Sequence, residues 1–462
     1  MKLSDIVVVG AGPAGVRAAE ALVQAGLRPI VIDESPRAGG QVYRQPPEGF
    51  VRSKKQLYGF ESRKADDIHR SFERLAGQIV HRPSTLAWNC DGRRLDLLTD
   101  GRRRSQPFSH LILCTGAMDR VLPFPGWLLP GVYTLGAAQV ALKAQACVLG
   151  GRVALVGTGA LLYLLAYQYA RAGAEIAAVL DTASSASKPG ALIGLSRQPL
   201  TLAKGLYFIA WLRSRGIRVI DGVQDVAVAG GEQVEALSWR RNGHEHRIAC
   251  DAVAAGFGLR AETQLADLAG CEFDFEPSVR QWLPRRDATG RSSVACVYLA
   301  GDGASILGAD AAELAGRRAA LALLEDLGEP TCDGEGQRLE RALRPMIAFQ
   351  RGMEKAFPLP SAEIRACRDD LVICRCENVD AGALRRAVRD GGVMEINRLK
   401  AMTRVGMGRC QGRVCAGAAA EILACSTGKA VADVGRLRAQ PPIKPIPMAA
   451  SQPDHPAVRE RA

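Results

Sequence analysis

The amino-acid sequence predicts an α/β protein with two Rossmann-like domains, the second inserted in the first, followed by a small, mostly helical C-terminal module and an extended tail. Three observations lead to this fold class. Two strand–glycine–helix–strand patterns begin near Asp5 and Gly151, and each is typical of a parallel βαβ unit. The 49 glycines among 462 residues suit the many tight turns of such units. Two close cysteine pairs, between residues 374 and 415, indicate a separate module.

The first pattern runs from a buried strand in "IVVVG" through a glycine-rich turn and a helix to a second strand in "RPIVID". Gly10, Gly12 and Gly15 fit the motif G-x-G-x-x-G, whose glycines allow a tight turn, the approach of a pyrophosphate and close helix–strand packing, in that order. Pro13 and Ala14 lie at the N-terminus of the helix, which favours phosphate charge. The unit therefore predicts a dinucleotide site.

The second strand of this unit ends on an acid. Asp33 comes eighteen residues after Gly15, where a carboxylate can accept hydrogen bonds from an adenosine ribose. Glu34 is the alternative residue for this role.

Three further segments resemble signatures of the two-dinucleotide-binding-domain flavoproteins, the glutathione-reductase-like superfamily. They are "RAGGQVYR", with Gly40 and Gln41; "HLILCTGAMDRVLPFPG", with Thr115 and Gly116; and "VACVYLAGDGASILG", with Gly301 and Asp302. The resemblance implies FAD, with the first segment beside the flavin phosphates, the second closing the FAD domain and the aspartate of the third bonding the ribitol. Another adenine nucleotide in the same groove is the alternative. The implied FAD-binding domain is discontinuous, over residues 1–126 and 251–325.

The inserted domain, residues 127–250, corresponds in that superfamily to an NAD(P)H-binding domain, but its motif is damaged. Gly157 and Gly159 are present, whereas Leu162 stands in place of the third glycine and crowds the approach of a phosphate. Asp181, the candidate ribose acid, comes nineteen residues after Leu162 rather than eighteen. We therefore expect a retained fold with lost or altered NAD(P)H binding.

Four cysteines are the candidate metal ligands. Cys374 and Cys376 form C-x-C, while Cys410 and Cys415 form C-x-x-x-x-C. Zinc ribbons use C-x-x-C knuckles, which these spacings fit poorly. A [2Fe–2S] cluster needs two thiolates on each of two irons and tolerates more varied loops. Structural zinc and unligated thiols are the alternatives.

The segments "CRCENV" and "TRVGMGRCQGRVC" resemble the bacterioferritin-associated-ferredoxin-like (BFD-like) [2Fe–2S] domain, here residues 371–430. The resemblance carries the four ligands onto the four cysteines named above. Arg375, Arg409 and Arg413 flank these cysteines and are expected to offset the negative charge of the cluster.

Composition and the remaining segments limit the partners. The formal charge of +12 is spread along the chain without interleaved aromatic residues, so no nucleic-acid partner is expected. No apolar run reaches the about 20 residues of a membrane span. The first apolar run is already a strand of the fold, which favours the cytoplasm.

Residues 326–370 are expected to form a linker, and the Pro-rich residues 431–462 an extended or mobile tail.

Over nearly its full length the chain resembles the electron-transfer (alpha) subunit of heteromeric amine dehydrogenases. That family includes the A subunit of opine oxidase, the α subunit of D-hydroxyproline dehydrogenase and the B subunit of hydrogen cyanide synthase. The resemblance implies a flavin and [2Fe–2S] oxidoreductase subunit, whose β-subunit partner, of D-amino-acid-oxidase type, carries its own FAD and oxidises the C–N bond. It also implies FMN at the subunit junction and an external electron acceptor, and a small third subunit is an option.

Two other functions are open at this stage. The chain could be a self-contained NAD(P)H-dependent flavin/[2Fe–2S] reductase, or a cluster-carrying assembly or storage partner with a vestigial flavin fold. No catalytic residue is assigned, and the sequence does not choose among opine, D-hydroxyproline and glycine-type substrates.

Overall fold

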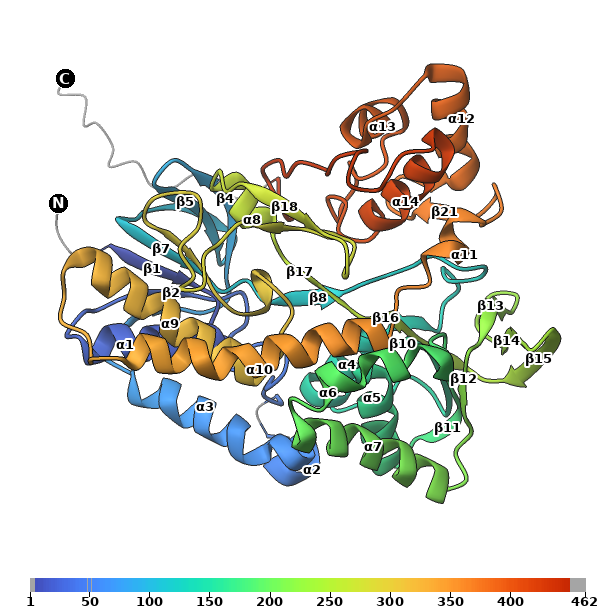
Figure 1. Ribbon diagram of the computed structural model, residues 1–462, viewed down its shortest axis with the longest axis horizontal. Helices are drawn as coiled ribbons and strands as arrows, with labels where there is room; N and C mark the ends of the chain where they lie inside the picture. Colours follow the sequence, from blue (N-terminus) through green and yellow to red (C-terminus); the bar gives the residue numbers. More distant parts are fainter. Residues whose placement is uncertain (1–4, 48, 51, 449–462) are drawn as a thin grey trace, which may run out of the picture.

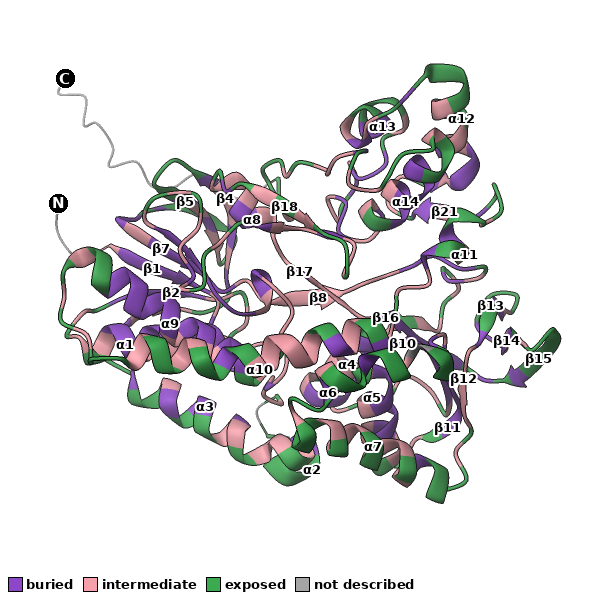
Figure 2. Cartoon of the chain, viewed as in Figure 1, coloured by how far each residue is buried: buried purple, intermediate pink, exposed green. Residues whose placement is uncertain are grey.

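The chain forms two α/β domains that lie side by side and a small helical module at one end of them (Figure 1). The computed structural model describes residues 5–47, 49–50 and 52–448. Figure 2 shows the inner strands of both central sheets as largely buried, with exposed residues on the outer helices. Within the described residues, no helix is long and apolar enough to cross a membrane.

A five-stranded parallel sheet forms the centre of the first domain, in the order β20-β7-β1-β2-β3. Its strands are β1 (Ile6–Val9), β2 (Ile30–Ile32), β3 (Val80–Arg82), β7 (His110–Leu113) and β20 (Val297–Leu299). Alternate residues of β1 face opposite sides of the sheet. Val8 belongs to a core shared with helices α1 (Pro13–Gln24), α3 (Ser62–Arg74) and α9 (Ala309–Leu327). The short helices α2 (Lys54–Tyr58) and η1 (Gly59–Glu61) precede α3.

The other face of this sheet packs on an antiparallel sheet. Val7 and Val9 share a core with Leu95 and Leu97, which lie on the middle strand of the order β4-β5-β6. These strands are β4 (Thr85–Asp91), β5 (Arg94–Thr99) and β6 (Arg102–Pro107). Helix α8 (Gln264–Leu268) and the hairpin of β18 (Phe273–Glu276) and β19 (Gln281–Pro284) lie on the same side.

The second domain has its own parallel sheet, in the order β12-β11-β10-β16-β9. Its strands are β9 (Val132–Thr134), β10 (Arg152–Thr158), β11 (Glu175–Asp181), β12 (Val219–Asp221) and β16 (Ala252–Phe257). Helices α4 (Leu135–Ala144), α5 (Ala160–Arg171) and α7 (Pro199–Ser214) accompany it, with η2 (Ser185–Ser187), η3 (Pro189–Ala191) and α6 (Leu192–Leu195) between α5 and α7. A three-stranded antiparallel sheet follows, of β13 (Gln224–Ala229), β14 (Ala236–Arg241) and β15 (His244–Ala249).

The domain boundary expected at residue 250 is corrected by the parallel sheet. Strand β16 pairs with β10 along its whole length, so the inserted domain continues to Phe257. The chain then returns to the first domain through a two-stranded ribbon, in which β17 (Leu259–Ala261) pairs with β8 (Ala117–Asp119). The boundary lies in this ribbon, because β16 lies between β10 and β9 and is therefore an integral part of the second parallel sheet.

The expected linker, residues 326–370, is also corrected, because it is largely helical. Helix α10 (Glu335–Ala356) runs along the front of both α/β domains in Figure 1. Arg318 of α9 forms an ion pair with Glu340 of α10 (2.8 Å). At the other end, Gly352 lies so close to Gly194 of α6 that a Cβ on either would meet backbone at 2.8 Å. This segment therefore holds the two domains together rather than separating them.

The C-terminal module consists of short strands and helices. They are α11 (Ser361–Arg365), β21 (Val372–Cys374), β22 (Val379–Asp380), α12 (Ala381–Gly391), α13 (Ile396–Thr403) and α14 (Ala416–Thr427). Its core is continuous with that of the second domain: Trp127 is buried there, and its Nε1 donates to the carbonyl of Val372 (2.9 Å).

The tail is extended and packed as far as it is described. Arg436 forms two hydrogen bonds with the carboxylate of Asp267 (2.6 and 2.8 Å). Ile443 is buried in the core of the first domain, and its N–H donates to the carbonyl of Trp88 (3.1 Å). The rest of the predicted tail, residues 449–462, lies outside the described residues.

A glycine on α9 tests the packing of the first domain. A Cβ at Gly316 would lie 2.0 Å from the backbone oxygen of Ala14 on α1. Gly316→Ala should therefore lower the free energy of unfolding by about 1–3 kcal/mol, measured by urea denaturation. The matched control is Gly205→Ala on α7, where a Cβ meets nothing within 4 Å and alanine should be neutral or stabilising by up to about 1 kcal/mol. Equal effects at both positions would contradict this packing.

Candidate functional site

The first glycine loop is built by close backbone packing. A Cβ at Gly10 would lie 2.3 Å from the carbonyl oxygen of Cys114, and one at Gly15 would lie 1.7 Å from that of Gly10. Gly10 also has a φ of +106°, which favours glycine. Gly12 is different: its φ is −76°, and the nearest atom to a Cβ there is the Cα of Gly40, at 3.6 Å. The protein itself does not require glycine at position 12, so the open space above it suits a ligand.

The structure brings four of the predicted segments together around this loop. Gly12 faces Gly40, and a Cβ at Gly40 would lie 2.9 Å from the Cα of Gly12. A Cβ at Gly301 would meet the side chain of Ala14 at 2.8 Å. A Cβ at Gly303 would meet Oγ1 of Thr115 at 2.3 Å. Segments separated by about three hundred residues thus lie together at the carboxyl ends of β1, β7 and β20, where α/β sheets bind ligands.

The two candidate ribose acids have different surroundings. Asp33 lies at the end of β2 and accepts hydrogen bonds from the N–H groups of Ala11 (2.5 Å) and Ser35 (2.6 Å). These bonds hold its carboxylate against the glycine loop and leave further lone pairs for ribose hydroxyls. Glu34 instead forms an ion pair with Lys444 of the tail. The geometry therefore favours Asp33.

The remaining predicted contacts are Pro13, Gln41, Thr115, Gly116 and Asp302. Pro13 is the first residue of α1, whose N-terminus faces the groove. Gln41 is exposed and accepts a hydrogen bond from Arg44 (2.8 Å). Asp302 accepts hydrogen bonds from the N–H groups of Leu307 (2.9 Å) and Gly308 (3.0 Å). Burial raises the pKa of Asp302 above its ordinary value, although these two bonds oppose the rise.

The second glycine loop lies between a strand and a helix, as in a nucleotide site, but the acidic residue expected to bind the ribose is engaged by the protein. Leu162 is fully buried in the core of the inserted domain. The carboxylate of Asp181 is buried as well, and it accepts hydrogen bonds from the hydroxyl of Tyr163 (2.5 Å) and the N–H of Ala183 (2.9 Å). Burial raises the pKa of Asp181. Asp181 is fully buried and a phenol engages one of its carboxylate oxygens, so its carboxylate is less accessible to a ribose than that of the half-buried Asp33.

The four predicted cysteine ligands lie together in the C-terminal module. Cys374 ends β21, Cys415 directly precedes α14, and both are buried. Cys376 and Cys410 are half-buried. The four sulfurs lie close enough to change one another's pKa, Cys415 acting on Cys374 and Cys410, and Cys410 on Cys376. In the described part of the chain, no three His, Cys, Asp or Glu side chains are arranged to hold a single metal ion.

Backbone N–H groups surround these sulfurs. The thiol of Cys415 and the N–H of Gly406 lower the pKa of Cys374 to about 6. The thiol of Cys415 and the N–H groups of Val414 and Gly412 lower the pKa of Cys410 to about 5. The thiols of Cys374 and Cys410 in turn raise the pKa of Cys415, and burial raises that of Cys376. The backbone N–H groups around the sulfurs fit an anionic cluster, because N–H···S bonds compensate its charge.

A buried ion pair joins the cysteine loop to the first domain. Arg413, between Cys410 and Cys415, makes two hydrogen bonds to the carboxylate of Glu262 (2.6 and 3.1 Å). Burial alone would raise the pKa of Glu262, but the charge of Arg413 holds it below its ordinary value. The backbone of Glu262 also accepts a hydrogen bond from Oγ1 of Thr115 (2.6 Å), and its N–H donates to the carbonyl of Gly116 (3.0 Å).

These contacts correct one expectation and add residues that the sequence does not indicate. The sequence predicts that Arg413 offsets the charge of the cluster, but the charge of Arg413 is matched by Glu262. Arg375 and Arg409 are exposed. Two further residues of the junction, Arg260 and Gln264, donate to carbonyls of the cysteine loop from about 150 residues away in sequence. In the sequence, Arg260 and Gln264 stand out only as polar residues in the segment where the chain returns from the inserted domain to the first domain.

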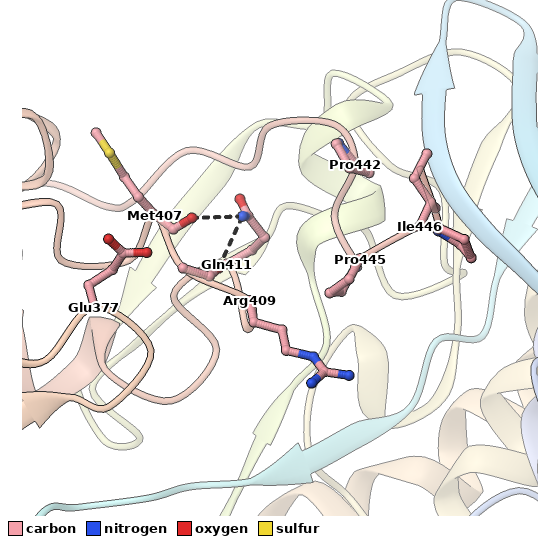
Figure 3. Close-up of a pocket in the computed structure, with 9 residues that line it drawn as sticks. Glu377, Met407, Arg409, Gln411, Pro442, Pro445 and Ile446 are labelled. Carbon is pink, nitrogen blue, oxygen red and sulfur yellow. Dashed lines mark hydrogen bonds between the residues drawn. The ribbon is translucent and has the colours of Figure 1, made fainter. Parts of the chain in front are cut away.

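An open cavity of about 600 Å³ lies beside the cysteine loop. Figure 3 shows Glu377, Met407, Arg409 and Gln411 on one side of it, facing the proline-rich tail on the other. The side-chain amide of Gln411 donates to the carbonyls of Met407 and Gly408 (both 3.1 Å). The half-buried sulfurs thus lie on a part of the module that solvent reaches.

Two family models match the chain. Residues 4–320 match the pyridine nucleotide-disulphide oxidoreductase family, and residues 372–425 match the BFD-like [2Fe-2S] binding domain. The first implies FAD and the second an iron–sulfur cluster. The open backbone at Gly12, the acid at the end of β2 and the four thiols with their N–H donors fit these two groups.

Several known proteins are similar over nearly the whole length. The A subunit of opine oxidase from Rhizobium meliloti is 36% identical, with 96% of this chain and 86% of that protein covered. The HcnB subunit of hydrogen cyanide synthase from Pseudomonas aeruginosa is 35% identical, with 96% and 98% covered. Among solved structures, L-proline dehydrogenase from P. horikoshii has a similar fold, with a TM-score of 0.69 at 22% identity over 97% of this chain and 79% of that one.

Gly12→Val should abolish FAD binding and leave the fold intact. The reason is that a Cβ at this position makes only an ordinary contact with the protein, 3.6 Å from the Cα of Gly40, while the branched side chain takes the space that a pyrophosphate needs. Flavin absorbance after purification, with circular dichroism for the fold, measures both. Gly15→Ala is the contrasting control, because its Cβ would collide with backbone and should destabilise the domain itself. Stoichiometric FAD in the Gly12→Val protein would contradict the site.

NADH and NADPH should be poor reductants of the flavin. Leu162 fills the place of the third glycine, and Tyr163 engages Asp181. Stopped-flow absorbance with each nucleotide is the measurement, with dithionite as the control that the flavin can be reduced. Full reduction within milliseconds at micromolar NADH would show that the second site works.

Proposed function

The chain belongs to the pyridine nucleotide-disulphide oxidoreductase family and is a flavin and iron–sulfur oxidoreductase subunit, and from this we propose its role. It is the electron-transfer subunit of a heteromeric amine or imino-acid dehydrogenase, and it passes electrons between flavin and the [2Fe–2S] cluster. The substrate class is an opine, D-hydroxyproline or a glycine-type amine. Oxidation of the C–N bond takes place on a partner subunit.

The observation that carries this proposal is the direct contact between the two candidate cofactor sites. Thr115 and Gly116, at the flavin groove, bind the backbone of Glu262. The carboxylate of Glu262 binds Arg413, which lies inside the cysteine loop. Flavins accept hydride pairs and release electrons singly, whereas an iron–sulfur cluster carries one electron. A chain that fixes both groups on one hydrogen-bonded path is suited to this conversion.

The partner is proposed from the relatives. The opine oxidase and hydrogen cyanide synthase relatives are each named as one subunit of an enzyme. The partner of this chain is then a flavoprotein of D-amino-acid-oxidase type, with FMN at the junction. The scheme is completed by an external electron acceptor, and a small third subunit is an option.

The second nucleotide loop supports this proposal over an NAD(P)H-dependent reductase. A reductase would need the inserted domain to bind a nicotinamide nucleotide, and the acid available for its ribose is engaged by Tyr163. Electrons reaching the flavin must then come from another donor, which the partner subunit supplies.

The cluster should lie on the route of electrons out of the flavins. Cys410→Ser should weaken or abolish the [2Fe–2S] signal in electron paramagnetic resonance. In a complex purified with its native partners, substrate should still reduce the flavin, while steady-state transfer to the acceptor falls by about tenfold or more, as for loss of a metal-site group. A screen of opines, D-amino acids and proline derivatives identifies the substrate.

Cys425→Ser is the matched control, because Cys425 is exposed on α14. Size-exclusion chromatography of the Cys410→Ser complex is needed, since loss of a cluster can unfold a small module. If this complex stays assembled and turnover with the acceptor is unchanged, the cluster has a structural role and the proposed electron route is wrong.

A further inference from the structure

A cavity between the first domain and the cysteine module is unusually rich in arginine. It has a volume of about 120 Å³, and the arginines that line it come from β17, the hairpin of β18 and β19, the cysteine loop, the tail and the segment after β8. They are Arg120, Arg260, Arg280, Arg413 and Arg436.

Three of these arginines have carboxylate partners. Arg413 pairs with Glu262 (2.6 Å), and Arg436 pairs with Asp267 (2.6 Å). Arg280 pairs with the buried carboxylate of Glu421 on α14. These contacts leave two guanidinium groups that face the cavity.

Arg120 and Arg260 are the two that remain. Across the described residues, neither forms an ion pair, although Glu354 and Glu421 lie in the wider surroundings of Arg120, and Glu262 lies near Arg260. Both oxygens of Glu262 are already engaged by Arg413. Burial, together with the like charge of Arg260, lowers the pKa of Arg120 to about 10. Arg120 and Arg260 are both half-buried, and a charge that is partly withdrawn from water is stabilised by a counter-charge.

Arg260 lies against the cysteine loop. Its Nη1 donates to the carbonyl of Arg413 (2.9 Å), in the middle of the loop between Cys410 and Cys415. The sulfurs of these two cysteines are among the negative groups that act on its guanidinium. With its four thiolates the cluster is anionic, and it gains one more negative charge when it is reduced.

We propose that Arg260, with Arg120 behind it, is the counter-charge of the iron–sulfur cluster and raises its reduction potential. The arginines beside the cysteines in sequence, Arg375 and Arg409, have a smaller effect because they are exposed and solvent screens their charge. Arg260 is a positioning residue in this role. It favours electron transfer from flavin to cluster without touching substrate.

The test uses the full-length chain, loaded with its cluster and without a partner subunit. Arg260→Gln keeps a hydrogen-bond donor for the carbonyl of Arg413 but removes the charge, whereas Arg260→Lys keeps the charge. The midpoint potential is measured by redox titration followed by electron paramagnetic resonance. Arg260→Gln should lower the equilibrium constant for reduction by about tenfold or more, which is about 59 mV for one electron. Arg260→Lys should recover most of this loss.

Arg409→Gln is the matched control at the exposed position. Its shift should be smaller than that of Arg260→Gln and should disappear in about 1 M salt, where the Debye length is about 3 Å. More of the shift from Arg260→Gln should persist, because Arg260 is half-buried and lines a cavity, where its charge is screened less than at an exposed position. Iron and sulfide analysis and circular dichroism show whether each variant holds its cluster and its fold.

Three results would overturn the proposal: an unchanged potential in Arg260→Gln, equal potentials in the Gln and Lys variants, or a larger shift in Arg409→Gln. If Arg260→Gln does not hold a cluster, Arg120→Gln carries the test, since no hydrogen bond joins its side chain to the cysteine loop within the described structure. An unchanged potential in that variant also overturns the proposal. The measurement involves neither amine substrate nor partner, so its failure is distinct from failure of the proposed function.

Discussion

The ion pair between Glu262 and Arg413 is the interaction on which the arrangement of the two cofactor sites depends. Both groups are largely buried, and removal of one would leave the other as an uncompensated charge, at a cost of about 3–5 kcal/mol. Each residue of the pair also makes hydrogen bonds to other parts of the chain. The backbone of Glu262 holds Thr115 and Gly116, and Arg413 holds the tail through the carbonyl of Ile443. The flavin groove, the cysteine loop and the tail therefore share one anchoring point.

Local sequence patterns predict the parts of this protein that local physics determines. The glycine loop can be found because a Cβ at Gly15 would meet the backbone of Gly10, five residues earlier, and because the positive φ of Gly10 favours glycine. The cysteine pairs can be found because their spacing reflects the chemistry of thiolate ligands. The damage to the second loop is visible in Leu162 and in the late position of Asp181. The role of Tyr163 needs the structure, because it depends on where a helix side chain points.

The parts that could not be predicted depend on contacts distant in sequence. Residues 326–370 contain a helix whose partners, Arg318 and Gly194, lie in two different domains, so its polar sequence resembles a linker. A boundary at residue 250 falls before β16 because an apolar strand gives no sign of the sheet that it joins. Arg260 and Glu262 acquire their significance only when the cysteine loop packs against them. The flanking arginines look like the counter-charges in the sequence, but Arg375 and Arg409 are exposed and Arg413 is paired with Glu262.

The tail has a consequence for the maturation of the protein. Residues 436–444 bind Asp267, Trp88, Arg413 and Glu34, and ribosomes complete all of these partners before they reach the tail. Since domains fold in the order of their synthesis, the flavin domain can take up its nucleotide while the cysteine module is still unfinished. The tail is the last segment to settle across the junction. The tail therefore closes the junction only after the flavin domain and the cysteine module have both been synthesised.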